Sequence, residues 1–313
     1  MNFAVLFPGQ GSQRVGMGAE LAKNFTAARR TFEEADDALK FALSRLCFEG
    51  PEEELRLTTN TQPAMVAAAI AAYRALEAEV PLSAGLGAGH SLGEYSALTA
   101  AGSLDFGAVL RAVRERGRLM QEACPAGEGT MAALIGLDRE TVAEICAQAS
   151  TGGQVVVAAN LNGPGQIVVA GHTPAVRRAL ELAKERGSGK AIELKVSAPF
   201  HSPLMGPARA GMEPVLEGLA VAAPRFGVIA NVTAEVNLDP ARIKPLLLEQ
   251  ITAPVRWEES MSVIARSGIT ETFEFGCGKV LAGLMRRIDR NVIVRPVEDL
   301  ASLKAAATAL AAE

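Results

Sequence analysis

The middle of the chain carries a run of secondary-structure patterns that few folds can accommodate. Strand patterns occur at Thr130–Leu137, Val155–Ala159, Gln166–Ala170 and Lys190–Val196, and helical patterns at Arg139–Ala149 and Thr173–Arg186. Their order is β-α-β-β-α-β, which is typical of a ferredoxin-like unit. Pro125-Ala126-Gly127 and Ala198-Pro199 bound this stretch, so residues 127–197 are expected to form a compact inserted subdomain.

The sequence on either side of this insertion alternates strands with helices. Strands are expected at Phe3–Phe7, Ser83–Gly89, Val228–Asn231 and Thr270–Phe275. Helices are expected at Met17–Leu46 with a break, Gln62–Ala78, Tyr95–Ala101, Asp105–Gln121, Pro240–Ile251 and Glu258–Ser267. Alternation of this kind predicts an α/β layer fold with a parallel sheet. We therefore expect residues 1–126 and 198–313 to form one core and residues 127–197 a separate small subdomain.

Composition excludes several classes of protein. With 49% hydrophobic residues and a net charge of only −4, the chain is not intrinsically disordered. The mild acidity argues against a nucleic-acid surface. The longest apolar run, Ala64–Tyr73, is shorter than the ~20 residues of a membrane span, so no membrane association is expected. The N-terminus lacks the charged segment of a signal peptide, and a cytoplasmic protein is expected.

Cysteine and histidine usage narrows the chemistry further. The four cysteines form no CxxC pair, and reduced thiols are expected at Cys47, Cys124, Cys146 and Cys277. The three histidines are not at metal-ligand spacing, so no metal site is expected from His90, His172 and His201. A histidine acid or base must therefore be one of these three.

One short motif predicts a nucleophile. Gly89-His90-Ser91-Leu92-Gly93 matches G-x-S-x-G, in which a sharp strand-to-helix turn holds the serine oxygen clear of the sheet. The amides at the start of the following helix can stabilise an oxyanion. We therefore predict Ser91 as a nucleophile.

A serine hydroxyl needs a base, because it is a poor nucleophile at neutral pH. In hydrolase-like sheets the histidine follows the serine, and His201 lies 110 residues downstream where the chain leaves the insertion. His172 is expected to cap a helix and His90 to form structural hydrogen bonds. No acidic residue between Ser91 and His201 stands out, so we predict a Ser–His dyad whose imidazole is oriented by another acceptor.

An arginine on an apolar helix face is the remaining anomaly. In the helix expected at Asp105–Gln121, Arg116 falls on the stripe of Phe106, Val109 and Val113. Two interpretations are open: a buried functional cation, or an arginine at the edge of the stripe that extends to water.

Several motifs together resemble one family, the malonyl-CoA:acyl carrier protein transacylases of type II fatty acid synthesis, which are related to polyketide acyltransferase domains. The motifs are Phe7-Pro8-Gly9-Gln10-Gly11-Ser12-Gln13, Thr61-Gln62-Pro63-Ala64, Gly89–Glu94, Arg116-Gly117, Asn160–Gln166, Phe200-His201 and Gln250. The resemblance covers essentially the whole chain. It implies a hydrolase-like α/β core with a ferredoxin-like insertion and a monomer. It also implies transfer of malonyl from malonyl-CoA to the phosphopantetheine thiol of acyl carrier protein, through a malonyl-serine, with no cofactor.

The same resemblance implies roles for individual residues. Ser91 would be the nucleophile and His201 the base, held by the backbone carbonyl of Gln250. The backbone amides of Gln10 and Leu92 would form the oxyanion hole. Arg116 would bind the malonyl carboxylate. Gln62 and Asn160 would line the pocket, and Phe200 would crowd the α-carbon of the acyl group.

Some assignments stay open at this stage. Carrier proteins are acidic, which makes Lys190, Lys195, Arg286 and Arg287 docking candidates. Cys277 stands where the family usually has proline, which is expected to loosen a turn. The carrier could serve polyketide rather than fatty acid synthesis. A serine thioesterase or hydrolase and a non-catalytic carrier-docking subunit are further alternatives.

Overall fold

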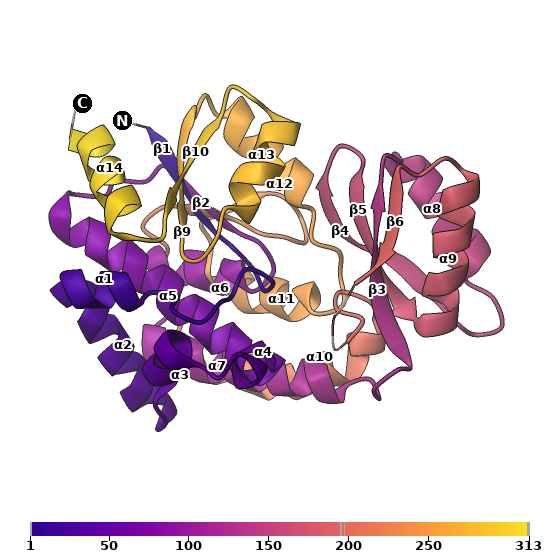
Figure 1. The fold of residues 1–313 in the computed structure, drawn as a ribbon, viewed down its shortest axis with the longest axis horizontal. Coiled ribbons are helices and arrows are strands. Elements are labelled where there is room, and N and C mark those ends of the chain that lie inside the picture. The colour runs from indigo at the N-terminus through magenta and orange to yellow at the C-terminus, as the bar shows by residue number, and fades with distance from the viewer. Residues whose placement is uncertain (1, 195, 197, 312–313) are drawn as a thin grey trace.

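The computed structural model describes residues 2–194, 196 and 198–311 and contains two sheets (Figure 1). The strands of the larger sheet are, in spatial order, β10 (Ile293–Val297), β9 (Glu271–Phe275), β1 (Phe3–Phe7), β2 (Leu86–Gly89), β7 (Gly227–Ile229) and β8 (Val236–Asn237). All neighbouring pairs are parallel except β7 and β8. The parallel sheet predicted for the core is confirmed.

Helices cover both faces of this sheet because β1 alternates its side chains between two apolar cores. Phe3, Val5 and Phe7 belong to one core, and Ala4 and Leu6 to the other. Helices on the first side are α1 (Ala19–Asn24), α2 (Thr26–Leu39), α3 (Leu43–Glu49), α4 (Glu52–Arg56), α5 (Thr58–Glu79), α6 (Gly93–Ala100) and α7 (Phe106–Glu122). Helices α12 (Trp257–Arg266) and α13 (Val280–Ile288) cover the second (Figure 1). The remaining elements are η1 (Pro203–Met205), α10 (Gly206–Glu217), α11 (Pro240–Gln250) and α14 (Leu300–Ala311).

The second sheet is antiparallel and lies beside the first (Figure 1). Its strands are, in spatial order, β4 (Val156–Gly163), β5 (Gln166–His172), β3 (Gly129–Ile135) and β6 (Lys190–Glu193). Helices α8 (Arg139–Ala149) and α9 (Thr173–Glu185) pack on one face. The chain order β3-α8-β4-β5-α9-β6 is the predicted order.

Strand β4 connects the small sheet to the core through backbone hydrogen bonds to Val255. The Leu161 amide donates to the Val255 carbonyl at 2.9 Å, and the Val255 amide donates to the Ala159 carbonyl at 2.9 Å. The register of β4 against β5 shifts between Ala158 and Asn160, which marks an irregularity at this point. The attachment holds Asn160 at the junction between the two sheets.

Several sequence-based boundaries are wrong. The helical stretch expected at Met17–Leu46 with one break has two breaks, because Phe25 is extended and Lys40 is left-handed. Strand β4 extends to Gly163 rather than ending at Ala159, and α10, α13, β10 and α14 were not predicted. Strand β6 ends at Glu193, and Lys195 lies outside the described residues. No helix in the described ranges combines the length and apolar character needed to cross a bilayer.

Candidate active site

Ser91 sits on a strained turn between β2 and α6, as the G-x-S-x-G motif predicts. Its φ of 51° lies in the left-handed region that non-glycine residues rarely adopt. A Cβ atom on Gly89 would lie 1.9 Å from the Gly93 carbonyl carbon, and one on Gly93 would lie 2.1 Å from the Phe7 carbonyl oxygen. Both glycines are therefore required by close backbone contact. The turn raises the Ser91 side chain above the carboxyl end of the parallel strands.

Asn231 clamps this turn from the end of β7. Its Oδ1 accepts from the Ser91 amide at 2.6 Å, and its Nδ2 donates to the Gly89 carbonyl at 2.7 Å. Asn231 is fully buried, so both bonds are shielded from water. Nothing in the sequence singles out this residue, because an asparagine 140 residues away carries no local signal.

His201 faces Ser91 across a hydrogen bond. Its Nε2 lies 2.7 Å from Ser91 Oγ, and its Nδ1 lies 2.8 Å from the Gln250 carbonyl oxygen. Burial, reinforced by the Arg116 guanidinium, lowers the pKa of His201 to about 3. The imidazole is therefore neutral near pH 7. Because the carbonyl can only accept, Nδ1 carries the proton and Nε2 is free to accept the Ser91 hydroxyl proton.

Arg116 lies at the same point, buried to 1% exposure on α7. Its Nη2 donates to Ser91 Oγ at 3.2 Å and to Gln250 Oε1 at 3.0 Å, and its Nη1 donates to Gln62 Oε1 at 2.9 Å. The interpretation as an arginine extending to water is therefore excluded. Within the described residues its Nε has no hydrogen-bond partner, and burial lowers its pKa. No carboxylate is hydrogen-bonded to this buried cation among the described residues.

The Glu94 carboxyl group continues this hydrogen-bond network on the other side of Gln250 from Arg116. Gln250 Nε2 donates to Glu94 Oε2 at 2.7 Å and to the Ser91 carbonyl at 3.0 Å, and the Asn231 amide donates to Glu94 Oε2 at 3.1 Å. Burial raises the pKa of Glu94 to about 7, and its hydrogen bonds from Gln250 and Asn231 oppose that rise. In the sequence Glu94 stands out only as the end of a motif. What marks Glu94 is its burial in the first turn of α6, which only the structure reveals.

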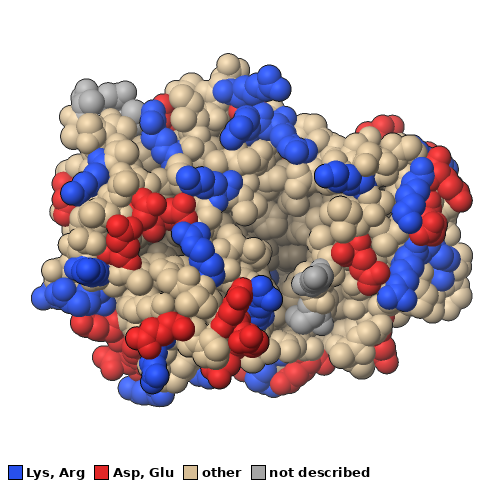
Figure 2. All heavy atoms as spheres, viewed as in Figure 1, with Lys and Arg blue, Asp and Glu red and all other residues tan. Residues whose placement is uncertain are grey.

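A cavity of about 620 Å³ opens above these groups. Figure 2 shows it as a hollow between the two parts of the molecule. Eight of the predicted site residues line it: Gln10, Gln62, Ser91, Leu92, Arg116, Asn160, Phe200 and His201. Gln250 is joined to these residues by hydrogen bonds: its Oε1 accepts from Arg116, and its backbone carbonyl accepts from His201 Nδ1. A larger concavity of about 720 Å³ lies on the outer surface of α9, and none of these residues lines it.

Two backbone N–H groups, those of Gln10 and Leu92, belong to residues that line this cavity. Across the described chain, the amides of Gln10 and Leu92 donate to no protein acceptor. Leu92 directly follows Ser91 and precedes α6, and Gln10 follows β1. The Gln10 side chain is held by a 3.4 Å hydrogen bond from Nε2 to Thr58 Oγ1.

The other histidines take structural positions. His90 Nε2 lies 2.8 Å from Asn162 Oδ1, so the prediction of a hydrogen-bonding role is confirmed. His172 is the N-cap residue of α9, as predicted, but its side chain makes no capping hydrogen bond: its Nδ1 accepts from the Val155 amide at 3.0 Å. No cluster of metal-ligating side chains occurs in the part of the chain that the structure describes. Lys190, Arg286 and Arg287 are exposed on β6 and on the last turn of α13.

Comparison with known proteins defines the class. The acyl transferase domain family matches residues 4–273, so the chain is an acyltransferase. The malonyl CoA-acyl carrier protein transacylase of Bacillus subtilis strain 168 is 46% identical over 99% of this chain and 98% of its own. That of Escherichia coli K12 is 42% identical over 97% of this chain and 98% of its own. The chain belongs to the family of malonyl CoA-acyl carrier protein transacylases, and the resemblance seen in the sequence is confirmed.

Solved structures agree with this assignment. An acyl-carrier-protein S-malonyltransferase from Burkholderia pseudomallei superposes with a TM-score of 0.95 and 48% identity, covering 98% of this chain and 100% of that one. A malonyl-transacylase solved in complex with a type II polyketide synthase acyl-carrier protein gives a TM-score of 0.96 and 43% identity, covering 99% and 100%.

Proposed function

We propose that this chain transfers the malonyl group from malonyl-CoA to the phosphopantetheine thiol of an acyl carrier protein, in two steps through a malonyl ester of Ser91. The observation that carries the proposal is the buried Arg116 guanidinium 3.2 Å from Ser91 Oγ. A cation at that distance suits an acyl group that ends in a carboxylate. The first step replaces a thioester bond with the Ser91 ester bond, and the second step replaces that ester bond with a new thioester bond. The scheme therefore needs no cofactor.

In the first step, Ser91 Oγ attacks the thioester carbonyl while its proton passes to His201 Nε2. The 2.7 Å separation of these two atoms is within range for that transfer. The amides of Gln10 and Leu92 stabilise the oxyanion that forms. As the intermediate collapses, the C–S bond breaks and His201 returns the proton to the leaving coenzyme A thiolate. The second step reverses this sequence with the carrier thiol as nucleophile.

Arg116 selects the acyl group. A charge-assisted hydrogen bond contributes about 1.5–3 kcal/mol, which is roughly 10- to 100-fold in discrimination. A neutral acyl group would leave the buried cation without its anion, which adds to the penalty. Gln62 holds the guanidinium from the other side at 2.9 Å. Phe200 crowds the α-carbon, and Asn160 lines the cavity beside it.

The architecture supports a division of labour between two parts. We propose a hydrolase-like core of residues 1–126 and 198–313, which supplies Ser91, His201 and Arg116. Residues 127–197 form a ferredoxin-like subdomain that closes the cavity with Met131 and Asn160. The chain would act as a cytoplasmic monomer. Lys190, Arg286 and Arg287 are candidates for docking the acidic carrier.

A second pathway uses the same chemistry. The structural match to a malonyl-transacylase bound to a type II polyketide synthase carrier favours polyketide supply as an alternative destination for the malonyl group. Comparing malonyl transfer to the fatty acid carrier and to any polyketide carrier of the same organism decides between the two.

Intact-protein mass spectrometry tests the reaction directly. Mixing the chain with malonyl-CoA is expected to add one malonyl mass, and adding holo-carrier is expected to remove it as carrier-bound malonyl. Ser91→Ala is expected to form no adduct. Release of the adduct as free malonate, at the same rate with and without carrier, would identify a hydrolase instead. An adduct that persists in Ser91→Ala would show that another residue is the nucleophile.

A further inference from the structure

The two backbone N–H groups assigned to the oxyanion hole are held in different ways. Leu92 is the N-cap residue of α6, so the helix sets the direction of its amide. The Gln10 amide lies in the loop after β1, between Gly9 and Gly11. Gly11 has a φ of 120°, and a Cβ atom there would meet nothing within 4 Å, so no packing holds the backbone at this point. The loop of residues 8–14, here called the oxyanion loop, therefore needs support from its neighbours.

The start of the oxyanion loop rests on the nucleophile turn. A Cβ atom on Gly9 would lie 2.7 Å from the His90 carbonyl oxygen, and the His90 amide donates to the Phe7 carbonyl at 3.0 Å. The Gln10 side chain adds a long hydrogen bond of 3.4 Å to Thr58. These contacts fix the loop before Gln10 but not after it.

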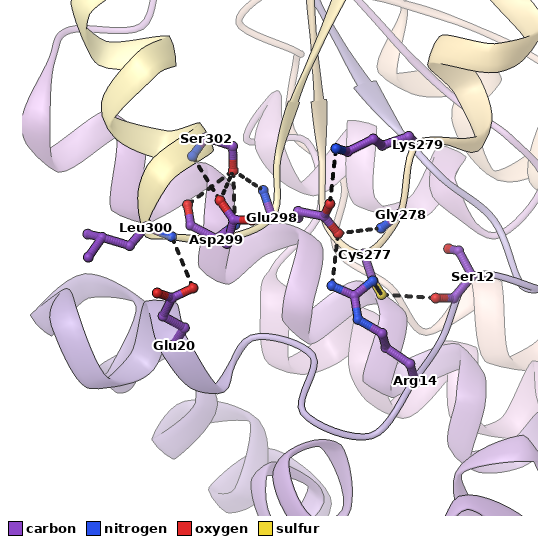
Figure 3. Close-up of polar contacts among 10 residues, drawn as sticks. All are labelled: Ser12, Arg14, Glu20, Cys277, Gly278, Lys279, Glu298, Asp299, Leu300 and Ser302. Carbon is purple, nitrogen blue, oxygen red and sulfur yellow. Dashed lines mark hydrogen bonds and ion pairs between the residues drawn. The ribbon is translucent and has the colours of Figure 1, made fainter.

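The end of the oxyanion loop is held by the segment that follows β9 (Figure 3). Cys277 Sγ donates to the Ser12 carbonyl at 2.9 Å, and Arg14 Nη1 donates to the same sulfur at 3.0 Å. Cys277 is 3% exposed, and burial raises the pKa of its thiol, so the thiol keeps its proton near pH 7 and can donate it to Ser12. The two segments are in close contact, since a Cβ atom on Gly278 would lie 2.9 Å from Ser12 Cβ.

Glu298 anchors this contact to the C-terminal part of the chain. Its Oε2 accepts from Arg14 Nη2 and from the Gly278 amide, each at 3.0 Å. Glu298 lies between β10 and α14, and its own amide donates to Ser302 Oγ at 3.0 Å. The Ser302 amide in turn donates to Asp299 Oδ1 at 2.8 Å. The carboxylate that receives Arg14 is therefore itself held by the first turn of α14.

Arg14 differs from an ordinary surface arginine. Its side chain is 55% exposed, and an exposed ion pair by itself contributes little to stability. Its guanidinium is forked, however, so that one nitrogen bonds the Glu298 carboxylate while the other bonds the buried sulfur of Cys277. That sulfur bonds the backbone two residues beyond Gln10. Arg14 thus links the oxyanion loop to the C-terminal segment.

We propose that Arg14 and Cys277 are positioning residues for malonyl transfer: by holding the Ser12 carbonyl, they direct the Gln10 amide into the oxyanion hole. Neither residue lines the catalytic cavity, so both act through the loop. The proposal rests on the proposed function, which assigns the oxyanion role to Gln10. Because the oxyanion forms only on the way through the transition state, a displaced amide should lower the maximal rate and leave substrate binding unchanged.

The test follows Ser91 malonylation by rapid-quench mass spectrometry with two acyl donors. Malonyl-CoA and malonyl-N-acetylcysteamine carry the same malonyl thioester on a long and a short thiol, so an oxyanion effect should act on both alike. Arg14→Ala is expected to lower kcat/KM for both acyl donors by the same factor, about tenfold. With malonyl-CoA the loss should lie in the maximal rate, and the half-saturating concentration should stay within about twofold. Complete removal of one such amide costs about 10²- to 10³-fold, and a displaced amide costs less.

A conservative variant of Cys277 separates the hydrogen bond from packing. Cys277→Ala removes the bond to Ser12 and is expected to lower the maximal rate about three- to tenfold. Cys277→Ser keeps a donor at the same place and should stay within about twofold of the unmodified chain. The double variant Arg14→Ala/Cys277→Ala should lose less than the product of the two single losses, because both residues act through one loop.

Matched controls separate positioning from general damage. Arg29 is an arginine of similar exposure that also pairs with a glutamate, and Cys146 is a buried cysteine on α8. Arg29→Ala and Cys146→Ala should leave both rates unchanged. Chemical denaturation of every variant reports stability separately. If Cys277→Ala does not fold, Arg14→Ala at its exposed position and Cys277→Ser decide the test.

Three outcomes would overturn the proposal. Unchanged rates in Arg14→Ala, even with lower stability, would show that the contact is only structural. A higher half-saturating concentration of malonyl-CoA with an unchanged maximal rate would assign Arg14 to binding. A maximal rate for Cys277→Ser well below that of the unmodified chain would show that the hydrogen bond to Ser12 is not what matters. Failure of the proposed function looks different, because the unmodified chain would then gain no malonyl mass from either acyl donor.

Discussion

The deep end of the catalytic cavity differs in its construction from the neighbouring cavity of about 190 Å³ between β4 and α13, here called the α13 groove, which is lined by Asn162, Gln166, Val280 and Leu284. At the deep end, Arg116, Gln250 and Glu94 are buried and joined by direct hydrogen bonds. In the groove, Gln166 and Val280 are at least partly open to solvent, and the Gln166 amide has no partner among the described residues. The polar side chains at the deep end are thus already held by protein hydrogen bonds, whereas the Gln166 amide in the groove is left to bond with a ligand.

This difference matches what each end must do. Selecting a carboxylate from similar acyl groups requires a cation whose position is already set, because a mobile one would accept other partners. The rest of a thioester substrate must bind and then leave in each half-reaction, which requires only modest contacts outside the deep end. Tight contacts there would slow product release without improving selection.

The largest expected effect comes from removing the cation at the deep end. Arg116→Ala should lower kcat/KM for malonyl-CoA by about 10²- to 10³-fold, because the malonyl carboxylate would lose its buried partner. Activity with acetyl-CoA should rise relative to malonyl-CoA. Arg118→Ala, an exposed arginine on the same helix, is the control. Equal losses with both acyl groups would remove Arg116 from selection.

The sequence predicted the deep end far better than its surroundings. The turn at Ser91, the base His201 and the place of Arg116 on an apolar stripe follow from a motif, a chain order and a helical period, although the period alone leaves the burial of Arg116 open. Asn231 and Glu94 do not, because their partners lie 137 or more residues away along the chain. The α13 groove was missed for a similar reason: α13 itself went unpredicted, so Val280 had no place in the site.

Glu94 offers a smaller test of the organised end. Glu94→Gln keeps the size of the side chain but places an amide where Oε2 accepts two hydrogen bonds. Gln250 would reorient, and Arg116 would lose its acceptor. We expect kcat/KM for malonyl-CoA to fall about tenfold, corresponding to one displaced bond of a charged group, and acetyl-CoA to fall less. Glu79→Gln, an exposed glutamate, should change neither.

Protonation provides a further test of the same end, through stability. Because the pKa of His201 is lowered to about 3, the folded state resists the proton that the unfolded chain takes up near pH 6.5. Stability is therefore lost as the pH falls from 6.5 toward 3, by up to about 1.4 kcal/mol per pH unit. Glu94, with its pKa raised to about 7, acts in the opposite direction and loses stability as the pH rises from 4.5 toward 7.

Chemical denaturation at several pH values separates these two contributions. His201→Gln should lose less stability than the unmodified chain between pH 6.5 and 4.5, because its side chain does not titrate. Glu94→Gln should lose more over the same range, because the opposing contribution of the raised carboxyl pKa is gone. Parallel curves for all three proteins would mean that neither group titrates as its burial requires.

The smallest expected effect lies in the groove. Val280→Ala removes two methyl groups from a half-exposed side chain, and we expect KM for malonyl-CoA to rise about threefold with little change in kcat. Such a split is expected because contacts far from the reacting carbonyl are made equally in the ground state and the transition state. Steady-state kinetics with malonyl-CoA and malonyl-N-acetylcysteamine measures it. A fall in kcat of the same size, with KM unchanged, would mean that Val280 belongs to the organised end of the site and that the two ends do not differ as described.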